Sequence, residues 1–269
     1  IPFELIHDIR DTDERSIYEK EDDIPVIICR IPVRNANGDV PYHTIPMGII
    51  LLEKIILTIC LEDSDILREI HENRLRGIDF IRPRSFVLHV FQRVALTYLR
   101  YLKEIQRQTT VVEKDLQRSI KNNELVKLLN MEKALVFFTT SLRSNELLTD
   151  KLMKSIFRNL DEEEEDLLED VVTERKQAIE MANIYSNILS GMMDAFASVI
   201  SNNLNTVMKR LTIISIVLMI PTLFASLYGM NVGLPFQNSP WIFWGIVGIS
   251  GVTAFLGWLF IGRTKTLRK

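Results

Sequence analysis

Residues 195–269 contain no aspartate or glutamate, although they carry six lysines and arginines. The preceding residues therefore hold all 35 acids against 26 bases, and the overall net charge of −3 hides this uneven distribution. Such a balance does not suggest a basic nucleic-acid-binding face, so we expect no nucleic-acid partner.

Other features that mark secreted proteins or enzymes are also missing. The only two cysteines, Cys29 and Cys60, lie in apolar runs, which indicates buried thiols in a reducing compartment. The first residues show no basic start followed by an apolar stretch, so no signal peptide is expected. There is no glycine-rich phosphate loop and no nucleophile elbow, and the four histidines lack the spacing of metal ligands. We expect neither an enzyme nor a binder of a small organic substrate.

Glycine and proline are absent from Arg84 to Ser190. Because these two residues end helices most readily, their absence predicts long helices with short breaks, near Lys121–Asn123 and Asn159–Asp161. Residues 1–83 differ, since they hold six of the nine prolines and several β-rich runs. We interpret them as a small α/β domain, with strands in Val26–Ile31 and Gly48–Cys60 and a helix in Ser64–Glu72.

The last cytosolic helix should begin in the acid run Asp161–Asp166, because carboxylates stabilise the N-terminus of a helix. Gly191 is the one break signal that we find between this point and Tyr228. The sequence therefore predicts one continuous helix about 100 Å long. A lone helix of that length has no reason to be stable, so we expect it to bundle with copies of itself.

Two uncharged segments close the chain, Leu211–Tyr228 with 18 residues and Trp241–Ile261 with 21. A bilayer core needs roughly 20 helical residues, so both segments are predicted to be transmembrane helices. Lys209 and Arg210 precede the first span, four bases follow the second, and the loop between the spans is uncharged. By the positive-inside rule, both termini are cytosolic and the loop is outside.

One face of the long helix has an unusual composition. Steps of three or four residues give Asp194, Ser198, Ser201, Asn205, Met208, Leu211 or Thr212, Ser215, Met219, Thr222 and Ser226. A coiled-coil seam would carry Leu or Ile at these positions. The stripe fits close packing of membrane helices through small residues, and it fits equally a water-lined pore.

The first span ends in Tyr228, Gly229, Met230 and Asn231. The motif Y-G-M-N, together with SNNLNTVMKRLT at Ser201–Thr212 and a basic tail, resembles the CorA family of magnesium transporters. The resemblance covers the whole chain, although family members carry further strands upstream of Ile1. It implies an integral protein of a bacterial or archaeal inner membrane.

The fold implied by the resemblance is an α+β cytosolic domain followed by long helices and two C-terminal transmembrane helices, assembled as a funnel-shaped homopentamer. The expected organisation is 1–83 α/β domain, 84–161 long cytosolic helices, 162–210 stalk helix, 211–231 first transmembrane helix, 232–240 outer loop, 241–262 second transmembrane helix and 263–269 basic cytosolic tail.

The function implied by the resemblance is passive Mg²⁺ uptake, with Co²⁺, Ni²⁺ or Zn²⁺ as alternative ions and a non-conducting membrane scaffold as the alternative of another class. Gly229, Met230 and Asn231 correspond to the selectivity filter. The family's pore positions correspond to Thr222, Met219, Leu211, Met208, Asn205, Ser201 and Asp194, which fall on the stripe found from spacing. The outer loop Val232–Ser239 has no carboxylate, so any attraction of cations there must come from dipoles.

The family also binds regulatory Mg²⁺ through cytosolic carboxylates between neighbouring subunits, which holds the pore closed. By its distance from the G-M-N motif, Asp170 corresponds to one of these carboxylates. The acid run Asp161–Asp166 is either a solvated helix start or part of such a sensor.

Overall fold

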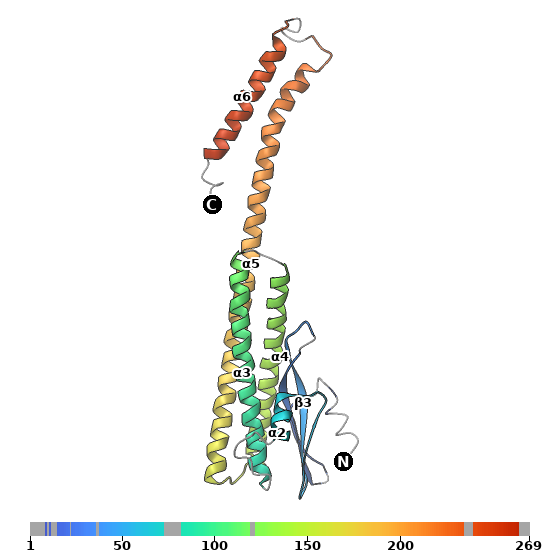
Figure 1. Ribbon diagram of the computed structural model, residues 1–269, viewed down its shortest axis with the longest axis vertical. Helices are drawn as coiled ribbons and strands as arrows, with labels where there is room; N and C mark the ends of the chain where they lie inside the picture. Colours follow the sequence, from blue (N-terminus) through green and yellow to red (C-terminus); the bar gives the residue numbers. More distant parts are fainter. Residues whose placement is uncertain are drawn as a thin grey trace. The chain divides into compact units, whose positions relative to one another are not determined.

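The computed structural model describes Ile9, Asp11 and residues 15–21, 23–35, 38–72, 82–118, 122–233 and 239–263, the last with side chains to residue 259. The chain forms two compact units, Ile1–Asp194 and Ala195–Lys269. The first unit contains an antiparallel sheet and long helices, and the second contains the C-terminal helices (Figure 1).

The sheet has four strands in the order β1-β2-β3-β4, each antiparallel to its neighbour. The strands are β1 Ile17–Glu21, β2 Ile24–Arg34, β3 Tyr42–Leu51 and β4 Ile56–Cys60. A turn at Glu53–Lys54 divides the predicted strand region Gly48–Cys60 into two strands, and Leu52 N–H donates to the Ile55 carbonyl there (2.9 Å). The predicted short helix is α2, Asp65–His71, and Leu67 N–H donates to the Ser64 hydroxyl at its N-cap (3.2 Å).

The stretch without glycine and proline is helical, as predicted. It forms α3 Pro83–Arg118, α4 Asn122–Met153 and the start of α5 Glu162–Tyr228, and α6 Ile242–Arg263 follows. The break between α4 and α5 contains Asn159 in the left-handed region (φ 60°). The 67-residue α5 also continues through Pro221, which membrane helices tolerate when nearby groups satisfy the freed carbonyl.

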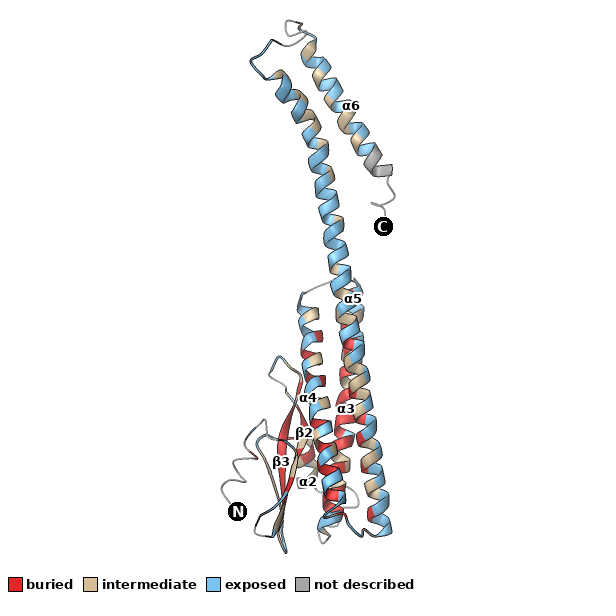
Figure 2. Ribbon diagram, turned by 180° about the vertical axis from the view of Figure 1, so that it is seen from behind, coloured by how far each residue is buried: buried red, intermediate tan, exposed pale blue. Residues whose placement is uncertain are grey.

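The core of the first unit lies between the sheet and the helices α3 and α4 (Figure 2). Tyr98 of α3 packs edge-on against Phe138 of α4, with ring centroids 5.1 Å apart. β1 pairs with β2 only as far as Ile28, and Arg30 lies beyond that end. There the buried Asn145 side chain replaces the missing strand: it accepts from Arg30 N–H (2.9 Å) and donates to the Arg30 carbonyl (2.8 Å). This pair of bonds ties α4 to the sheet.

The start of α5 is fixed by a reciprocal capping interaction. Glu164 N–H donates to Asp161 Oδ1 (2.8 Å), and Asp161 N–H donates to Glu164 Oε2 (3.4 Å). Arg82, just before α3, pairs with Asp161 (3.2 Å) and Glu163 (3.1 Å). At these three positions the acid run is a helix start held to α3, and all six acids except the buried Glu164 are exposed.

Candidate ion-conducting face of helix α5

Two helices are long and apolar enough to cross a membrane. The apolar window of α5 has a mean hydropathy of 2.1, that of Ile242–Leu259 in α6 has 1.8, and neither window contains a buried residue. Exposure of such segments is expected when lipid or further copies of the chain cover them.

Within the second unit, α6 lies beside one face of α5 (Figure 1). A Cβ built on Gly257 of α6 would lie 3.5 Å from Val217 Cγ2 of α5. The half-buried residues of α5 recur at helical spacing around this contact: Ile213, Val217, Ile220, Phe224 and Tyr228. This apolar stripe is the face that α6 covers.

The polar stripe predicted from the sequence lies on the other side of α5. At 100° per residue, Met208, Ser215, Met219 and Thr222 lie roughly 140–180° around the helix from Val217. The stripe is exposed, with Met208 59% and Met219 66% accessible. Leu211 lies nearer its margin, about 120° from Val217, and is 56% exposed.

The other predicted pore positions are also exposed. Ser201 and Asn205 lie on the same side of α5 below the apolar segment, and Asp194 lies at the end of the first unit. The structure thus places the second-unit stripe residues together on one helix face, away from α6.

The hydroxyl groups of the stripe donate to their own helix. Thr212, Ser215 and Thr222 each donate to the carbonyl four residues earlier, at 2.9, 3.0 and 2.8 Å. Because each proton is used, the oxygen lone pairs remain as acceptors on the exposed face. Acceptors in that position can receive hydrogen bonds from water around a cation.

The G-M-N motif closes α5. Gly229 N–H donates to the carbonyls of Ala225 (3.0 Å) and Ser226 (3.2 Å), and the helix ends at Tyr228. Met230 and Asn231 follow in an exposed turn. The negative end of the helix dipole therefore lies beside the Asn231 amide, and both attract a cation without a carboxylate.

Asp170, the predicted regulatory position, is exposed on α5 and faces α3. Gln92 Nε2 of α3 donates to its carboxylate at 3.5 Å. Partial burial and the nearby Asp170 charge raise the pKa of Glu174, one turn further along. Among the described residues, no group of three His, Cys, Asp or Glu side chains is placed to hold a metal ion. Asp170 would need ligands from elsewhere to complete a site.

Sequence reasoning missed Arg175, which lies on the buried stripe of α5 with Val171 and Ala178. Its side chain is only 6% exposed, and Glu146 of α4 lies 3.7 Å from Nη2. Among the residues that the structure describes, Nε and Nη1 have no hydrogen-bond partner, and burial lowers the pKa of the guanidinium. A charged residue at the spacing of a core position was the signal that could have identified it.

We expect Arg175→Met to raise the thermal unfolding midpoint of the complete chain in detergent, by an amount equivalent to about 1 kcal/mol. Replacing a poorly paired buried charge by an apolar side chain of similar length removes a desolvation cost. Lys176→Met, at the adjacent exposed position, is the control and should leave the midpoint unchanged. A lower midpoint for Arg175→Met would mean that the guanidinium stabilises the fold.

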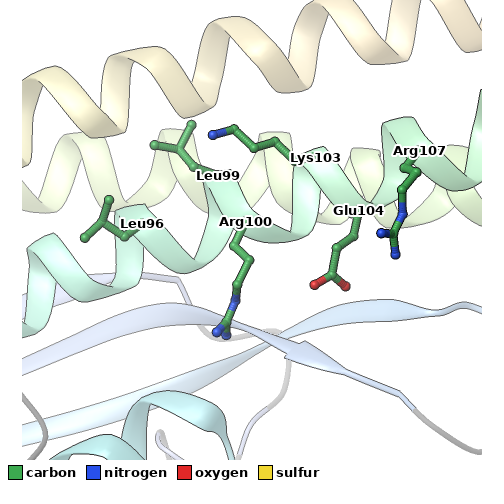
Figure 3. Close-up of a pocket in the computed structure, with 6 residues that line it drawn as sticks. All are labelled: Leu96, Leu99, Arg100, Lys103, Glu104 and Arg107. Atoms are coloured by element: carbon green, nitrogen blue, oxygen red, sulfur yellow. The ribbon is translucent and has the colours of Figure 1, made fainter.

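A shallow pocket of about 440 Å³ lies on the outer face of α3 (Figure 3). Its lining residues are Leu96, Leu99, Arg100, Lys103, Glu104 and Arg107. Arg100 pairs with Asp65 (2.6 Å) and Glu104 with Arg34 (2.5 Å). Lys103 and Arg107 have no ion-pair partner among the described residues, so this face carries a net positive charge.

The family described as CorA-like Mg2+ transporter protein matches residues 1–263. The chain belongs to this family. The resemblance drawn from the G-M-N motif is therefore confirmed, and the chain is a divalent-cation transporter rather than an enzyme.

Individual relatives agree with this assignment. The cobalt/magnesium transport protein CorA of Methanocaldococcus jannaschii is 26% identical over 244 residues, which cover 88% of this chain and 76% of that protein. The magnesium transport protein CorA of Helicobacter pylori (strain 26695) is 23% identical over 208 residues, 73% of this chain. The chain spans only 63% of the length of that second relative.

A solved structure confirms the fold class. The complete structure of the CorA magnesium transporter from Methanocaldococcus jannaschii superposes with a TM-score of 0.80 at 25% identity, over 98% of this chain and 84% of that chain. The predicted α+β domain, long stalk helix and two C-terminal spans are thus all present in a CorA-like membrane protein.

Proposed function

We propose that this CorA-family chain forms a homopentameric channel for passive Mg²⁺ uptake, in which α5 of each copy lines the pore and α6 faces lipid. The observation that carries the proposal is the exposed polar stripe of α5, on the side away from the face that α6 covers. Ser215 and Thr222 gain nothing from facing lipid tails, whereas a ring of helices gives their hydroxyl groups a water-filled axis. A scaffold without conduction needs no such stripe.

Selection would occur at the ring of Asn231 amides beside Gly229 and Met230. Mg²⁺ gives up its water reluctantly, so a ring of amide oxygens is suited to hydrogen-bond the water shell of a hydrated ion. Bare carboxylates would require dehydration or hold the ion too long. The end of each α5 helix adds a negative dipole at the same level.

Gating would occur where apolar side chains narrow the axis. Met208, Leu211 and Met219 are exposed on the same side of α5 and would form rings that conduct when wet and close by losing water. Cytosolic Mg²⁺, bound through carboxylates such as Asp170, would favour the closed arrangement.

Co²⁺ is the second candidate ion, because the Methanocaldococcus relative is named for cobalt and magnesium transport. Ni²⁺ and Zn²⁺ are the remaining candidate ions, because they are also divalent metal cations. Purified chain in liposomes loaded with an ion-sensitive dye separates these candidates. The proposal requires Mg²⁺ entry down its gradient without an added energy source, and a membrane that stays impermeable to all four ions contradicts it.

The complete chain in mild detergent should have the native mass of five copies. The physical reason is that a stripe of polar side chains within a membrane segment has to be shielded from lipid. Native mass spectrometry or light scattering measures the copy number, and a monomer or dimer would exclude the proposed pore.

A further inference from the structure

One side of α4 is apolar but uncovered in the single chain. Leu129 is 40% exposed, Val136 54% and Leu147 72%. Their spacing places them on one helix face. These exposed apolar side chains alternate with polar ones such as Thr140 and Arg143 on the same face. Large apolar side chains that recur on one helix face make it a candidate interaction surface.

A second uncovered apolar surface lies on α5 and α3 in the same unit. Ile184 and Ile188 of α5 are 52% and 53% exposed, and Val111 of α3 is 56% exposed. The pocket on α3 ends at Arg107, four residues before Val111 on the same helix.

The two surfaces face away from each other. Tyr98 of α3 contacts Phe138 of α4, so these residues mark where the two helices meet. Arg107 lies about 180° around α3 from Tyr98, and Val136 lies about 160° around α4 from Phe138. Surfaces on opposite sides of one molecule can pair head to tail around a closed ring.

The two surfaces also match in height along the helices. The hydroxyl of Thr109 in α3 donates to the sulfur of Met131 in α4 (3.3 Å), so these two residues lie at about the same height. Because α3 and α4 run in opposite directions, Leu129, two residues before Met131, is level with Val111, two residues after Thr109. Arg175 of α5 lies 3.7 Å from Glu146 of α4, and these two helices also run in opposite directions. Val136, ten residues before Glu146, is therefore level with Tyr185, ten residues after Arg175 and next to Ile184. At 1.5 Å per residue, each apolar pair is level to within about 6 Å, because the Tyr98–Phe138 contact sets the register of α3 and α4 four residues differently.

Charged side chains beside these stripes match as well. Counted from the Thr109–Met131 bond, Glu132 of α4 is level with Arg107 of α3 to within one residue. Counted from the Arg175–Glu146 pair, Arg143 of α4 is level with Glu180 of α5 to within two residues. In the part of the chain that the structure describes, none of these four side chains makes an ion pair. Each pair has opposite charges.

We propose that the α4 stripe of one copy (Leu129, Val136 and the flanking Glu132 and Arg143) docks on the α3–α5 surface of the next copy (Val111, Ile184, Arg107 and Glu180). The inference rests on the proposed ring of copies around an axis parallel to α5. Rotation about such an axis preserves height, so residues that are level within one chain meet between neighbours. The occupant of each surface is therefore a second copy of this chain.

The test uses cysteine pairs in the complete chain. Val136→Cys combined with Ile184→Cys should form disulfides between copies on mild oxidation, in a ladder that ends at the closed ring, because a disulfide requires Cα atoms within about 7 Å. Each single variant should stay uncrosslinked, since a head-to-tail contact never brings two equal positions together. Leu147→Cys with Ile184→Cys is the matched control: Leu147 lies on the same stripe but roughly 16 Å further along α4.

Native mass of the wild-type chain is measured in parallel. A pentamer in which the Val136–Ile184 pair crosslinks no faster than the Leu147 control overturns the docking surface and leaves the proposed channel standing. The docking surface is also contradicted if either single cysteine variant crosslinks as fast as the Val136→Cys, Ile184→Cys pair. A monomeric wild type contradicts both the channel and the interface. At least a tenfold rate advantage for the level pair is the expected result.

A charge exchange provides a second readout. Arg143→Glu should lower the pentameric fraction in dilute detergent, and adding Glu180→Arg should restore it. If Glu180 instead faces the ring axis, the second substitution will not rescue the first, and the proposed pairing is wrong.

Discussion

Replacing Asn231 by alanine should reduce Mg²⁺ flux into liposomes by about ten- to a hundredfold while the oligomer stays intact. The amide is exposed in the turn after α5, and its removal deletes one hydrogen-bonding group per copy from the proposed filter. A hydrogen bond to a charged partner is worth roughly 1.5–3 kcal/mol, and each 1.4 kcal/mol in a barrier is about tenfold in rate.

The filter variant has a control on α5, the helix that precedes the filter. Asn203 is exposed but lies about 40° around α5 from Val217, on the side that faces away from the polar stripe. Asn203→Ala should conduct like the wild type, which separates the filter from a general effect of losing an asparagine.

Competition between ions sharpens the same measurement. If the Asn231 amide binds the water shell of the ion, removing it should reduce both the flux and the discrimination between ions. The remaining flux through the Asn231→Ala variant should therefore be less selective for Mg²⁺ over Co²⁺. Wild-type flux with unchanged selectivity would show that the amide is no part of the filter.

Helical periodicity explains why the stripe on α5 could be predicted. Residues three and four apart share a face wherever the chain is helical, so Ser215, Met219 and Thr222 had to lie together. Which side of α5 would receive α6 could not be predicted, because α6 is apolar all round and has no face that singles out Val217. That contact depends on the packing of small residues such as Gly257.

The polar contacts of the first unit were beyond the reach of the sequence for a related reason. Asn145 lies in the middle of a helix and is far from Arg30 in the chain, yet it completes the backbone hydrogen bonds of β2. Arg175 lies at a core-spaced position of α5, and its charge could mark that position as unusual but could not identify its partner Glu146 on α4. Only the packing of α4 against the sheet and α5 shows what these side chains do.

The same packing changes the interpretation of the acid run at the start of α5. Asp161 and Glu164 cap the helix, and Glu163 pairs with Arg82. These residues therefore have a structural role that would confound a test of metal sensing. The acids suited to such a test are the exposed ones further along, Asp166, Glu169 and Asp170.

Neutralising these three acids together, as Asp166→Asn, Glu169→Gln and Asp170→Asn, should weaken inhibition by cytosolic Mg²⁺ while the pore still conducts. The carboxylates are exposed on one copy, and no three His, Cys, Asp or Glu side chains in the described parts of the chain are placed to hold a metal ion, so a bound cation would need ligands from a neighbouring copy. A site split in this way exists only while the copies are packed together. A ligand shifts a conformational equilibrium by its difference in affinity between the two states, and a split site supplies that difference.

The measurement is current through reconstituted channels against Mg²⁺ on the cytosolic side. Loss of the three charges should move half-inhibition to at least about tenfold higher Mg²⁺, which corresponds to a difference of 1.4 kcal/mol in binding free energy. The control neutralises three acids elsewhere in the same unit, as Glu53→Gln, Glu113→Gln and Asp115→Asn, and should keep the wild-type response. Because both triple variants change the net charge equally, a shift seen in both would reflect general electrostatics. Inhibition of the Asp166, Glu169 and Asp170 variant at the wild-type concentration would show that these carboxylates are only a solvated helix face.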